Sequence, residues 1–198
     1  RRQRQMCIRD RNNIMLDLEF LGKPPIARIT NIGACFFNPL TGEIGEQFYS
    51  SVEWANESDQ DLPFEASTVK WWLEQSADAT KELLTKDRQS LIIALGQFTE
   101  FVKRNTNPFK VEIWGNGDDC DCVVFEAAYK SVHFEQPWKF WSTRDVRTIV
   151  SAVNLIHKLD VKKTTPFEGI PHHALHDAIH QAKYVSLGYQ MLQMGVGS

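Results

Sequence analysis

Three short segments gather side chains able to bind metal ions or move protons. They are Asp17-Leu18-Glu19, Asp118-Asp119-Cys120-Asp121-Cys122 and His172-His173-Ala174-Leu175-His176-Asp177. Successive side chains of an extended strand point to opposite faces, so a strand over the first segment would place two carboxylates on one patch. Hard divalent cations prefer oxygen ligands of this kind. We therefore predict a metal site where the three segments meet.

Simpler explanations exist for each acidic segment taken alone. Two acids at a strand end are common and are often only solvated. Acids in the first turn of a helix complement its macrodipole, so capping explains one or two of the acids around Asp121. Three acids within four residues exceed that need. Cys120 and Cys122 would face different sides of a helix, and no second cysteine pair completes a zinc tetrahedron, so carboxylate ligands are favoured.

The histidine-rich segment adds a group that exchanges protons near neutral pH. The pattern predicts that Asp177 lies in the first turn of a helix and that His172, five residues earlier, lies on the preceding loop. A loop lets an imidazole approach a bound phosphate, whereas a carboxylate on a helix stays fixed. We interpret His172 as a candidate general base. His173, His176 and His180 are expected on the surface or at the helix flank.

The composition is that of an ordinary globular domain. The chain has 198 residues, of which 42% are hydrophobic and 24% charged, and this suffices for one sizeable core. It contains no apolar run long enough to cross a bilayer and no signal peptide. Its four cysteines do not suit a disulfide framework. We therefore expect a cytoplasmic protein with no membrane contact.

Charge is distributed unevenly along the chain. Residues 1–11 hold five Arg and one Asp, a net charge of +4, so the formal net charge of −3 leaves −7 on the remainder. We interpret this segment as a non-native or disordered extension ahead of a single domain over residues 12–198. Because an acidic body repels phosphate, binding of nucleic acid would depend on metal ions and on a few well-placed cations.

Strand and helix patterns succeed one another in a definite order. The sequence predicts five strands, over residues 13–18, 29–37, 46–52, 111–114 and 138–141. It predicts helices from Ser67, over 91–102 with Asp87 as N-cap, over 118–130, after Thr143 as N-cap, and over 175–194, with a long loop over 158–169. The fold expected is α/β, a mixed five-stranded sheet made of an antiparallel three-strand meander plus two parallel strands, with helices on both faces.

Taken together, these residues resemble a known motif set. Asp17-x-Glu19 on a first strand, Asp121 at the start of a helix after the fourth strand, and His172 with Asp177 resemble the DEDDh motifs of DnaQ-like 3'-5' exonucleases, which have the ribonuclease H fold. The likeness extends from Asn13 to about Tyr189. Longer stretches resemble a phage and bacterial branch of small stand-alone enzymes, described as exodeoxyribonuclease VIII-like or as 3'-5' exoribonucleases. These stretches are VKWWL (69–73), VEIWGNG (111–117), WKFWSTRDVRT (138–148) and FEGIPHHALHDAIHQAKYV (167–185).

The resemblance implies a metal-dependent exonuclease that hydrolyses phosphodiester bonds from the 3' end and releases nucleoside 5'-monophosphates. Asp17, Glu19, Asp121 and Asp177 would hold two Mg²⁺ or Mn²⁺ ions, and His172 would act as the general base. The substrate would be a nucleic acid with a free 3' end, preferably single-stranded, in a bacterial or phage-infected cell. A homodimer is left open, and no membrane partner is expected.

Further residues near these motifs are candidates for substrate contact. They are Leu18, Phe20, Val69, Trp72, Asn116 and Arg147. Trp71 and Trp72 are adjacent and cannot both face the core, so we expect one of them to be exposed, either covering a loop or stacking on a base. Arg147 is placed to meet a phosphate, and its alternative role is a surface salt bridge with Asp145.

Some positions depart from the family pattern, and two other functional classes stay open. Phe20 stands where Thr often follows the first motif, and Cys120 stands where a larger hydrophobic side chain is common. One alternative is a catalytically silent nucleic-acid-binding module of the same fold, against which the five intact motif residues argue. The other is a zinc hydrolase using His172, His176 and His180, in which the Glu of the metalloprotease motif is absent. DNA and RNA are both open as substrates.

Overall fold

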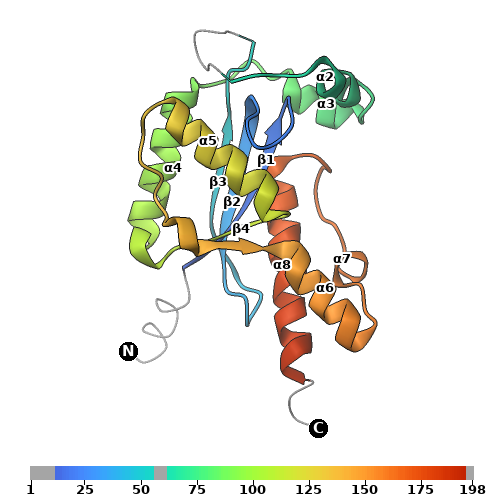
Figure 1. Cartoon of the computed structure of the whole chain (residues 1–198). Coiled ribbons are helices and arrows are strands. Elements are labelled where there is room, and N and C mark those ends of the chain that lie inside the picture. Colours follow the sequence, from blue (N-terminus) through green and yellow to red (C-terminus); the bar gives the residue numbers. More distant parts are fainter. Residues whose placement is uncertain (1–11, 56–61, 195–198) are drawn as a thin grey trace.

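The computed structural model describes residues 12–55 and 62–194, and the extension predicted over residues 1–11 lies outside the described residues. One five-stranded sheet, in the order β3-β2-β1-β4-β5, runs through the molecule (Figure 1). The antiparallel strands are β1 (Asn13–Phe20), β2 (Ile29–Phe37) and β3 (Ile44–Ser51), and the parallel ones are β4 (Glu112–Gly115) and β5 (Thr143–Asp145). The predicted mixed sheet is therefore confirmed.

The alternation of side chains along β1 divides the core into two layers. Ile14, Leu16 and Leu18 point to one face and join the hydrophobic cluster beneath two helices, α4 (Leu91–Asn105) and α5 (Val123–Ser131). Met15 points to the other face and packs with the helices there. Since Asp17 and Glu19 follow Met15 at intervals of two, they face that second layer.

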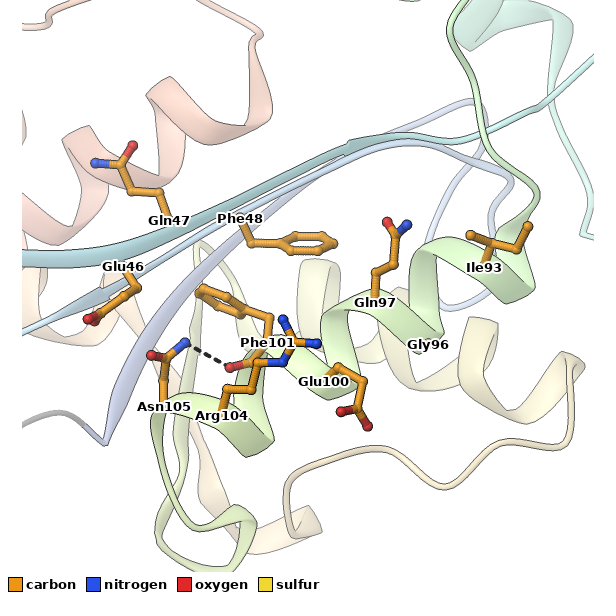
Figure 2. A pocket seen from close by; sticks show the side chains of 10 residues that line it. All are labelled: Glu46, Gln47, Phe48, Ile93, Gly96, Gln97, Glu100, Phe101, Arg104 and Asn105. Atoms are coloured by element: carbon orange, nitrogen blue, oxygen red, sulfur yellow. Dashed lines mark hydrogen bonds between the residues drawn. The ribbon is translucent and has the colours of Figure 1, made fainter.

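Helix α4 forms because its apolar side chains recur every three or four residues and bury one face against the sheet. Leu91, Leu95, Phe98 and Val102 are fully buried, and Lys103 and Arg104 stand in the last turn, where cations complement the helix dipole. A groove of about 810 Å³ lies between α4 and the edge strand β3. Figure 2 shows its lining, in which Phe48 of β3 lies near Phe101 of α4. This groove contains none of the predicted site residues.

The second layer consists of α6 (Val146–His157), the short α7 (Val161–Thr164) and α8 (Ala174–Met194). Val146 and Val153 of α6 pack with Ala178, Ala182 and Val185 of α8 over the sheet. Helix α8 crosses beneath β1 and β2, with its N-terminal end near the end of β1 that carries Glu19 (Figure 1). Within residues 12–55 and 62–194, no helix is long and apolar enough to span a membrane.

Two small helices cover the end of β1 that carries Glu19. They are α2 (Ala66–Leu73) and α3 (Ala77–Leu83), and a separate cluster of Leu21, Trp72, Ala79 and Leu83 holds them to the sheet. The sequence predicts α2 but not α3. Helix α3 is short and begins at the N-cap Ser76, whose side chain accepts a hydrogen bond from the Ala79 amide.

Several predicted boundaries are wrong. The fifth strand is Thr143–Asp145 and not 138–141, because Phe140–Ser142 form a 3₁₀ turn, and the N-cap of α6 is therefore Asp145 in place of Thr143. The Asp145 carboxylate accepts hydrogen bonds from the backbone amides of Arg147 and Thr148. Helix α4 is capped at Ser90 and not at Asp87. The predicted loop over 158–169 contains α7, with Asp160 as its N-cap.

Close approach of α8 to the sheet depends on a glycine. Gly33 of β2 pairs directly with Asp17 of β1. A Cβ at Gly33 would lie 2.1 Å from the peptide atoms of Ala174 and Leu175, at the start of α8. Only glycine fits such a contact, so Gly33 allows the first turn of α8 to lie against the strand beside Asp17.

Candidate active site

Three carboxylates from the two ends of the chain converge on the α8 side of the sheet. The ligand oxygens of Asp17, Glu19 and Asp177 all lie within 4.8 Å of one another. Asp17 and Glu19 come from β1, and Asp177 comes from the first turn of α8. The predicted convergence of the first and third segments is therefore present in the structure.

Asp177 is held in place by the start of its helix. Its amide donates to the carbonyl of His173 at 3.0 Å, and the backbone of His172 hydrogen-bonds its carboxylate. The second carboxylate oxygen, Oδ2, is buried and has no hydrogen-bond partner among the described residues. A buried oxygen without a partner is costly unless a cation or a water binds it. This oxygen therefore fits a metal ligand.

Asp121 lies beside this group, and its ligand atoms are not within the 4.8 Å set. It belongs to a π-helical turn, Asp118–Cys122, that leads into α5, and it is 4% exposed. The Leu18 amide donates to its Oδ1 and the Asn116 amide donates to its Oδ2, each at 3.2 Å. These two bonds fix the carboxylate between β1 and the loop after β4.

Crowding and burial change the electrostatics of all four acids. Burial raises the pKa of Asp17 and of Glu19 well above the ordinary value, and the charges of the neighbouring acids raise the pKa of both further. Burial also raises the pKa of Asp121 to about 6, against the two amides that lower it. The pKa of Asp177 is raised by burial as well. A hard divalent cation would relieve this repulsion, and the donor set suits one.

The structure adds Gln181, which the sequence reading did not identify. Its Nε2 donates to Asp17 Oδ1 at 2.7 Å, and its side chain is buried at 4% exposure. It lies one helical turn after Asp177 on the same face of α8. A polar residue within the buried stripe of Ala178, Ala182 and Val185 is the signal that could have pointed to it.

His172 lies on the loop before α8, as predicted. Its backbone is in the left-handed region, with φ of 62°. Its ring meets Trp71 edge-on with centroids 5.1 Å apart, and Trp72 at 6.1 Å. The imidazole makes no hydrogen bond to another described residue, so both ring nitrogens are available to a ligand or a water.

Comparison with known proteins decides the family. Residues 12–188 match the family model described as the 3'-5' exoribonuclease Rv2179c-like domain. The chain belongs to this family. It is thus a 3'-5' exonuclease, a hydrolase of phosphodiester bonds, and the DnaQ-like resemblance drawn from the five motif residues is confirmed. Enzymes of this family depend on divalent metal ions, which agrees with the carboxylate cluster.

Relatives and solved structures agree with this assignment. The chain is 25% identical over 190 residues to a protein of Enterobacteria phage T4 named exodeoxyribonuclease, covering 83% of each. Its fold is similar to the nuclease domain of 3'hExo, a DEDDh family member bound to rAMP, with a TM-score of 0.61, 13% identity and 92% of each chain covered. It is also similar to cell-death related nuclease 4, with a TM-score of 0.66 and 13% identity over 92% of this chain and 64% of the other. The ribonuclease H-like fold is confirmed.

Two residues predicted to contact substrate have buried side chains. Leu18 is 4% exposed on the α4 side of the sheet, and Trp72 is 2% exposed beneath α2, so these side chains offer little surface to a nucleotide. Phe20 and Val69 pack against the same clusters but are only partly buried, and they stay candidates. Trp71 is the tryptophan that is exposed, at 44%, which confirms that only one of the pair is buried.

Asn116 and Arg147 keep positions suited to substrate. Both line one cavity next to the carboxylates, on the side of α6. The alternative ion pair of Arg147 with Asp145 is absent among the described residues, because the Asp145 carboxylate caps α6 and accepts from the Gly117 amide at 3.2 Å.

His173, His176 and His180, predicted at the surface or at the helix flank, are half-buried and contact other parts of the protein. His173, whose side chain is 12% exposed, stacks between Tyr49 at 4.3 Å and His176 at 4.0 Å. The Ile170 amide donates to His176 Nδ1, and His180 Nε2 is hydrogen-bonded to the Thr165 carbonyl. In the described part of the chain, the group of side chains that could hold a metal ion contains only carboxylates, so the zinc-hydrolase alternative is not supported.

Proposed function

We propose that this exonuclease shortens single-stranded nucleic acid from a free 3' end, with Asp17, Glu19, Asp121 and Asp177 as its metal-binding acids and His172 as its general base. The observation that carries the proposal is that the ligand oxygens of Asp17, Glu19 and Asp177 lie within 4.8 Å of one another. One of them is accompanied by a buried oxygen, Asp177 Oδ2, that has no hydrogen-bond partner among the described residues. Two Mg²⁺ or Mn²⁺ ions are the metals that best suit such oxygen ligands.

Asp17, Glu19 and Asp177 would hold the metal ions, and Asp121 would complete the set from the adjoining loop. When bound, the ions supply an activated water and neutralise charge on the scissile phosphate. Gln181 holds Asp17 through one carboxylate oxygen and leaves the other free for a ligand. The first turn of α8 holds Asp177 against β1, so the three carboxylates are already close together before substrate binds.

His172 would take the proton. The attacking water gives a proton to a ring nitrogen of His172 as its oxygen bonds to phosphorus, and the 3'-oxygen of the preceding nucleotide leaves and is protonated by solvent. The loop position and the edge contacts with Trp71 and Trp72 hold the ring at the mouth of the site. The exposed Trp71 indole offers a face on which the terminal base can stack.

Both nucleic acids are candidate substrates. The family description names exoribonucleases, and the phage relative is named an exodeoxyribonuclease. The exposed Trp71 indole beside His172 suits an unpaired 3' end, because a base paired within a helix must first leave its stack. A cytoplasmic location and a homodimer stay predictions of the sequence.

A matched substrate set tests the proposal. RNA and DNA oligonucleotides, single- and double-stranded, carry a 5' label and are incubated with Mg²⁺, Mn²⁺ or Zn²⁺. We expect a ladder that shortens from the 3' end with Mg²⁺ or Mn²⁺, fastest on single strands. His172→Ala should slow each step by about 10²–10⁴-fold. Internal fragments, or decay that is unchanged in His172→Ala, would contradict the proposed roles.

A further inference from the structure

A second, cationic surface lies next to the carboxylates. Helices α6, α7 and α8 and the loop after β4 line a cavity of about 450 Å³, which we name the cationic pocket. Its polar side chains come from four elements. They are Asn116, Arg147, Ser151, Asn154, Asp160, Lys162 and Tyr184.

Among the side chains that the structure describes, those of residues 12–55, 62–117 and 119–194, none pairs with either cation of the pocket. No carboxylate oxygen of this set lies within 4.0 Å of the charged nitrogens of Arg147 or Lys162. The pocket also contains Asp160, but its carboxylate pairs with Lys163 at 3.3 Å and accepts from the Lys163 amide. Two unpaired cations side by side in an acidic molecule indicate an anionic ligand.

Arg147 is held in position by the loop after β4. Gly117 has φ of 107°, and a Cβ there would lie 2.8 Å from the Arg147 Cζ. The guanidinium therefore lies flat on a backbone that only glycine can form. An arginine fixed in this way loses less side-chain entropy when it binds a phosphate.

The pocket adjoins the carboxylates through Asn116. Asn116 lines it, and the Asn116 amide donates to Asp121 Oδ2. The charge of Lys162 lowers the pKa of Asp17, and that of Arg147 lowers the pKa of Asp121. Both cations are therefore close enough to act on the acids, although neither contacts them.

Tyr184 forms the buried part of the lining, at 1% exposure. Burial and the nearby carboxylates raise the pKa of Tyr184. Its hydroxyl therefore keeps its proton at neutral pH, and it has no hydrogen-bond partner among the described residues. A protonated hydroxyl beside two cations can donate to a phosphate oxygen.

The surroundings of the carboxylates differ on their two sides. Helix α2 lies near the top of Figure 1, and α6 and α7 lie lower, beside α8. Trp71 of α2 contacts His172, whereas Arg147 of α6 and Lys162 of α7 line the cationic pocket. An aromatic surface suits a base and a cationic one suits phosphate. A strand cleaved at its 3' end must carry its remaining phosphates away from the terminal nucleoside.

We propose that the cationic pocket binds a phosphodiester group of the substrate strand on the 5' side of the scissile bond. This assignment depends on the proposed exonuclease function, whose terminal nucleoside would lie on the side of Trp71. Arg147 and Lys162 neutralise the phosphate, and Asn116 and Tyr184 donate hydrogen bonds to it. The pocket thereby sets how the strand leaves the site.

Binding measurements at several salt concentrations test the pocket without catalysis. The His172→Ala variant keeps all proposed metal ligands and serves as background, in Mg²⁺, with a 5'-fluorescein-labelled single-stranded oligonucleotide followed by anisotropy. Adding Arg147→Gln and Lys162→Gln should weaken binding about tenfold at low salt. The slope of log affinity against log salt should become shallower by about 0.7 for one lost phosphate contact.

Lys158→Gln is the matched control. Lys158 follows α6, its Nζ donates to the Leu155 carbonyl, and it does not line the pocket, so affinity and salt slope should stay as in the background. An unchanged slope in the double variant would overturn the proposal. The proposal would also be overturned if the double variant lost binding of a nucleoside 5'-monophosphate but bound the oligonucleotide as the background does. The pocket would then hold the released product and not the strand.

Failure of the pocket and failure of the proposed catalytic roles give different results. A protein that degrades oligonucleotides normally, with the same salt slope in the double variant, refutes the pocket alone. A protein that shows the expected slope change but degrades no oligonucleotide in Mg²⁺ or Mn²⁺ refutes the catalytic roles and leaves the pocket assigned.

Discussion

At the scale of single residues, Asp17 connects the parts of the site. It shares the 4.8 Å group with Glu19 and Asp177, accepts a hydrogen bond from Gln181, and pairs across the sheet with Gly33. Its burial among other acids makes the charged form costly without a metal ion. The residue is therefore held in place for binding a cation at the expense of the stability of the metal-free protein.

Asp17→Asn should abolish hydrolysis while leaving folding intact or improved. Asparagine keeps the oxygen that accepts from Gln181 but removes one negative charge from the cluster. Each kcal/mol of repulsion relieved should raise Tm by about 2–4 °C. Cleavage of a labelled oligonucleotide and thermal unfolding in EDTA measure the two effects. Asp119→Asn, which removes a charge from an exposed side chain nearby, should keep activity. Wild-type cleavage by Asp17→Asn would make the assignment of the site wrong.

Gln181 donates to Asp17, and we expect it to act as a positioning residue for this proposed metal ligand. Gln181→Leu removes the amide donor and leaves Asp17 free to rotate, so the Mg²⁺ concentration for half-maximal activity should rise about 10–100-fold. A purely structural role would change Tm and leave this concentration unchanged.

The same substitution elsewhere on α8 provides the control. Gln190 donates to the Leu40 carbonyl at 3.1 Å, far along the helix from the acids. Gln190→Leu should leave the Mg²⁺ requirement as in the wild type. An equal requirement in Gln181→Leu and Gln190→Leu would show that Gln181 does not position Asp17.

At the scale of elements, the site depends on how closely α8 lies on the sheet. Asp177 reaches Asp17 because the Ala174–Leu175 peptide lies where a side chain at position 33 would stand. The His173 ring, stacked between Tyr49 of β3 and His176, ties the same loop to the edge of the sheet. Two contacts therefore fix the helix start that carries the third acid.

Gly33→Ala should disrupt this contact. The added methyl group meets backbone atoms that cannot move aside without displacing α8, so we expect a loss of about 1–3 kcal/mol in the free energy of unfolding. Activity should fall further than stability explains, because Asp177 moves away from Asp17. Urea unfolding and cleavage assays at a temperature where the variant is folded separate the two effects.

Gly96→Ala is the matched control for this change. Gly96 lies within α4 on the groove of Figure 2, and a Cβ there would meet no atom within 4 Å. Alanine in a helix interior should raise the free energy of unfolding by about 0.5–1 kcal/mol and leave activity unchanged. Similar behaviour of the two alanine variants would contradict the role of Gly33.

At the scale of the whole molecule, the acids of the site oppose the usual dependence of stability on pH. Asp17, Glu19 and Asp121 have folded-state pKa values above their ordinary ones, so the native state binds protons that the unfolded state releases. Their contribution to stability is complete below the unfolded pKa values and is lost as pH rises through the folded ones. For Asp121 the folded value is about 6.

The metal-free protein should therefore lose stability between about pH 4.5 and 7. The shift of Asp121 alone corresponds to a loss on the order of 3 kcal/mol. Acids with lowered pKa values, such as Asp145, stay ionised over this interval and do not oppose the trend. Urea unfolding in EDTA at several pH values measures this loss of stability. Saturating Mg²⁺ or the Asp17→Asn substitution should make the free energy of unfolding depend less on pH. A rise in stability over this interval would contradict the crowding of acids in one site.

The sequence alone predicted the meander and the mixed sheet, because alternation and helical spacing are local properties of the chain. The four acids and the histidine came from the likeness to the DEDDh motifs, and their roles stay predictions. It did not determine the short elements α3, α7 and β5, which form through capping and tertiary packing and not through periodicity. Nor did it distinguish Trp71 from Trp72, since exposure depends on what packs above them.

Only the tertiary structure decided the finer parts of the site. Gln181 donates to Asp17, which lies 164 positions away in the sequence. Gly33 is needed because the Ala174–Leu175 peptide at the start of α8 lies directly against it. Arg147 and Lys162 come to share one cavity when α6 and α7 pack against α8. Such contacts join residues distant in the chain, so no local pattern encodes them.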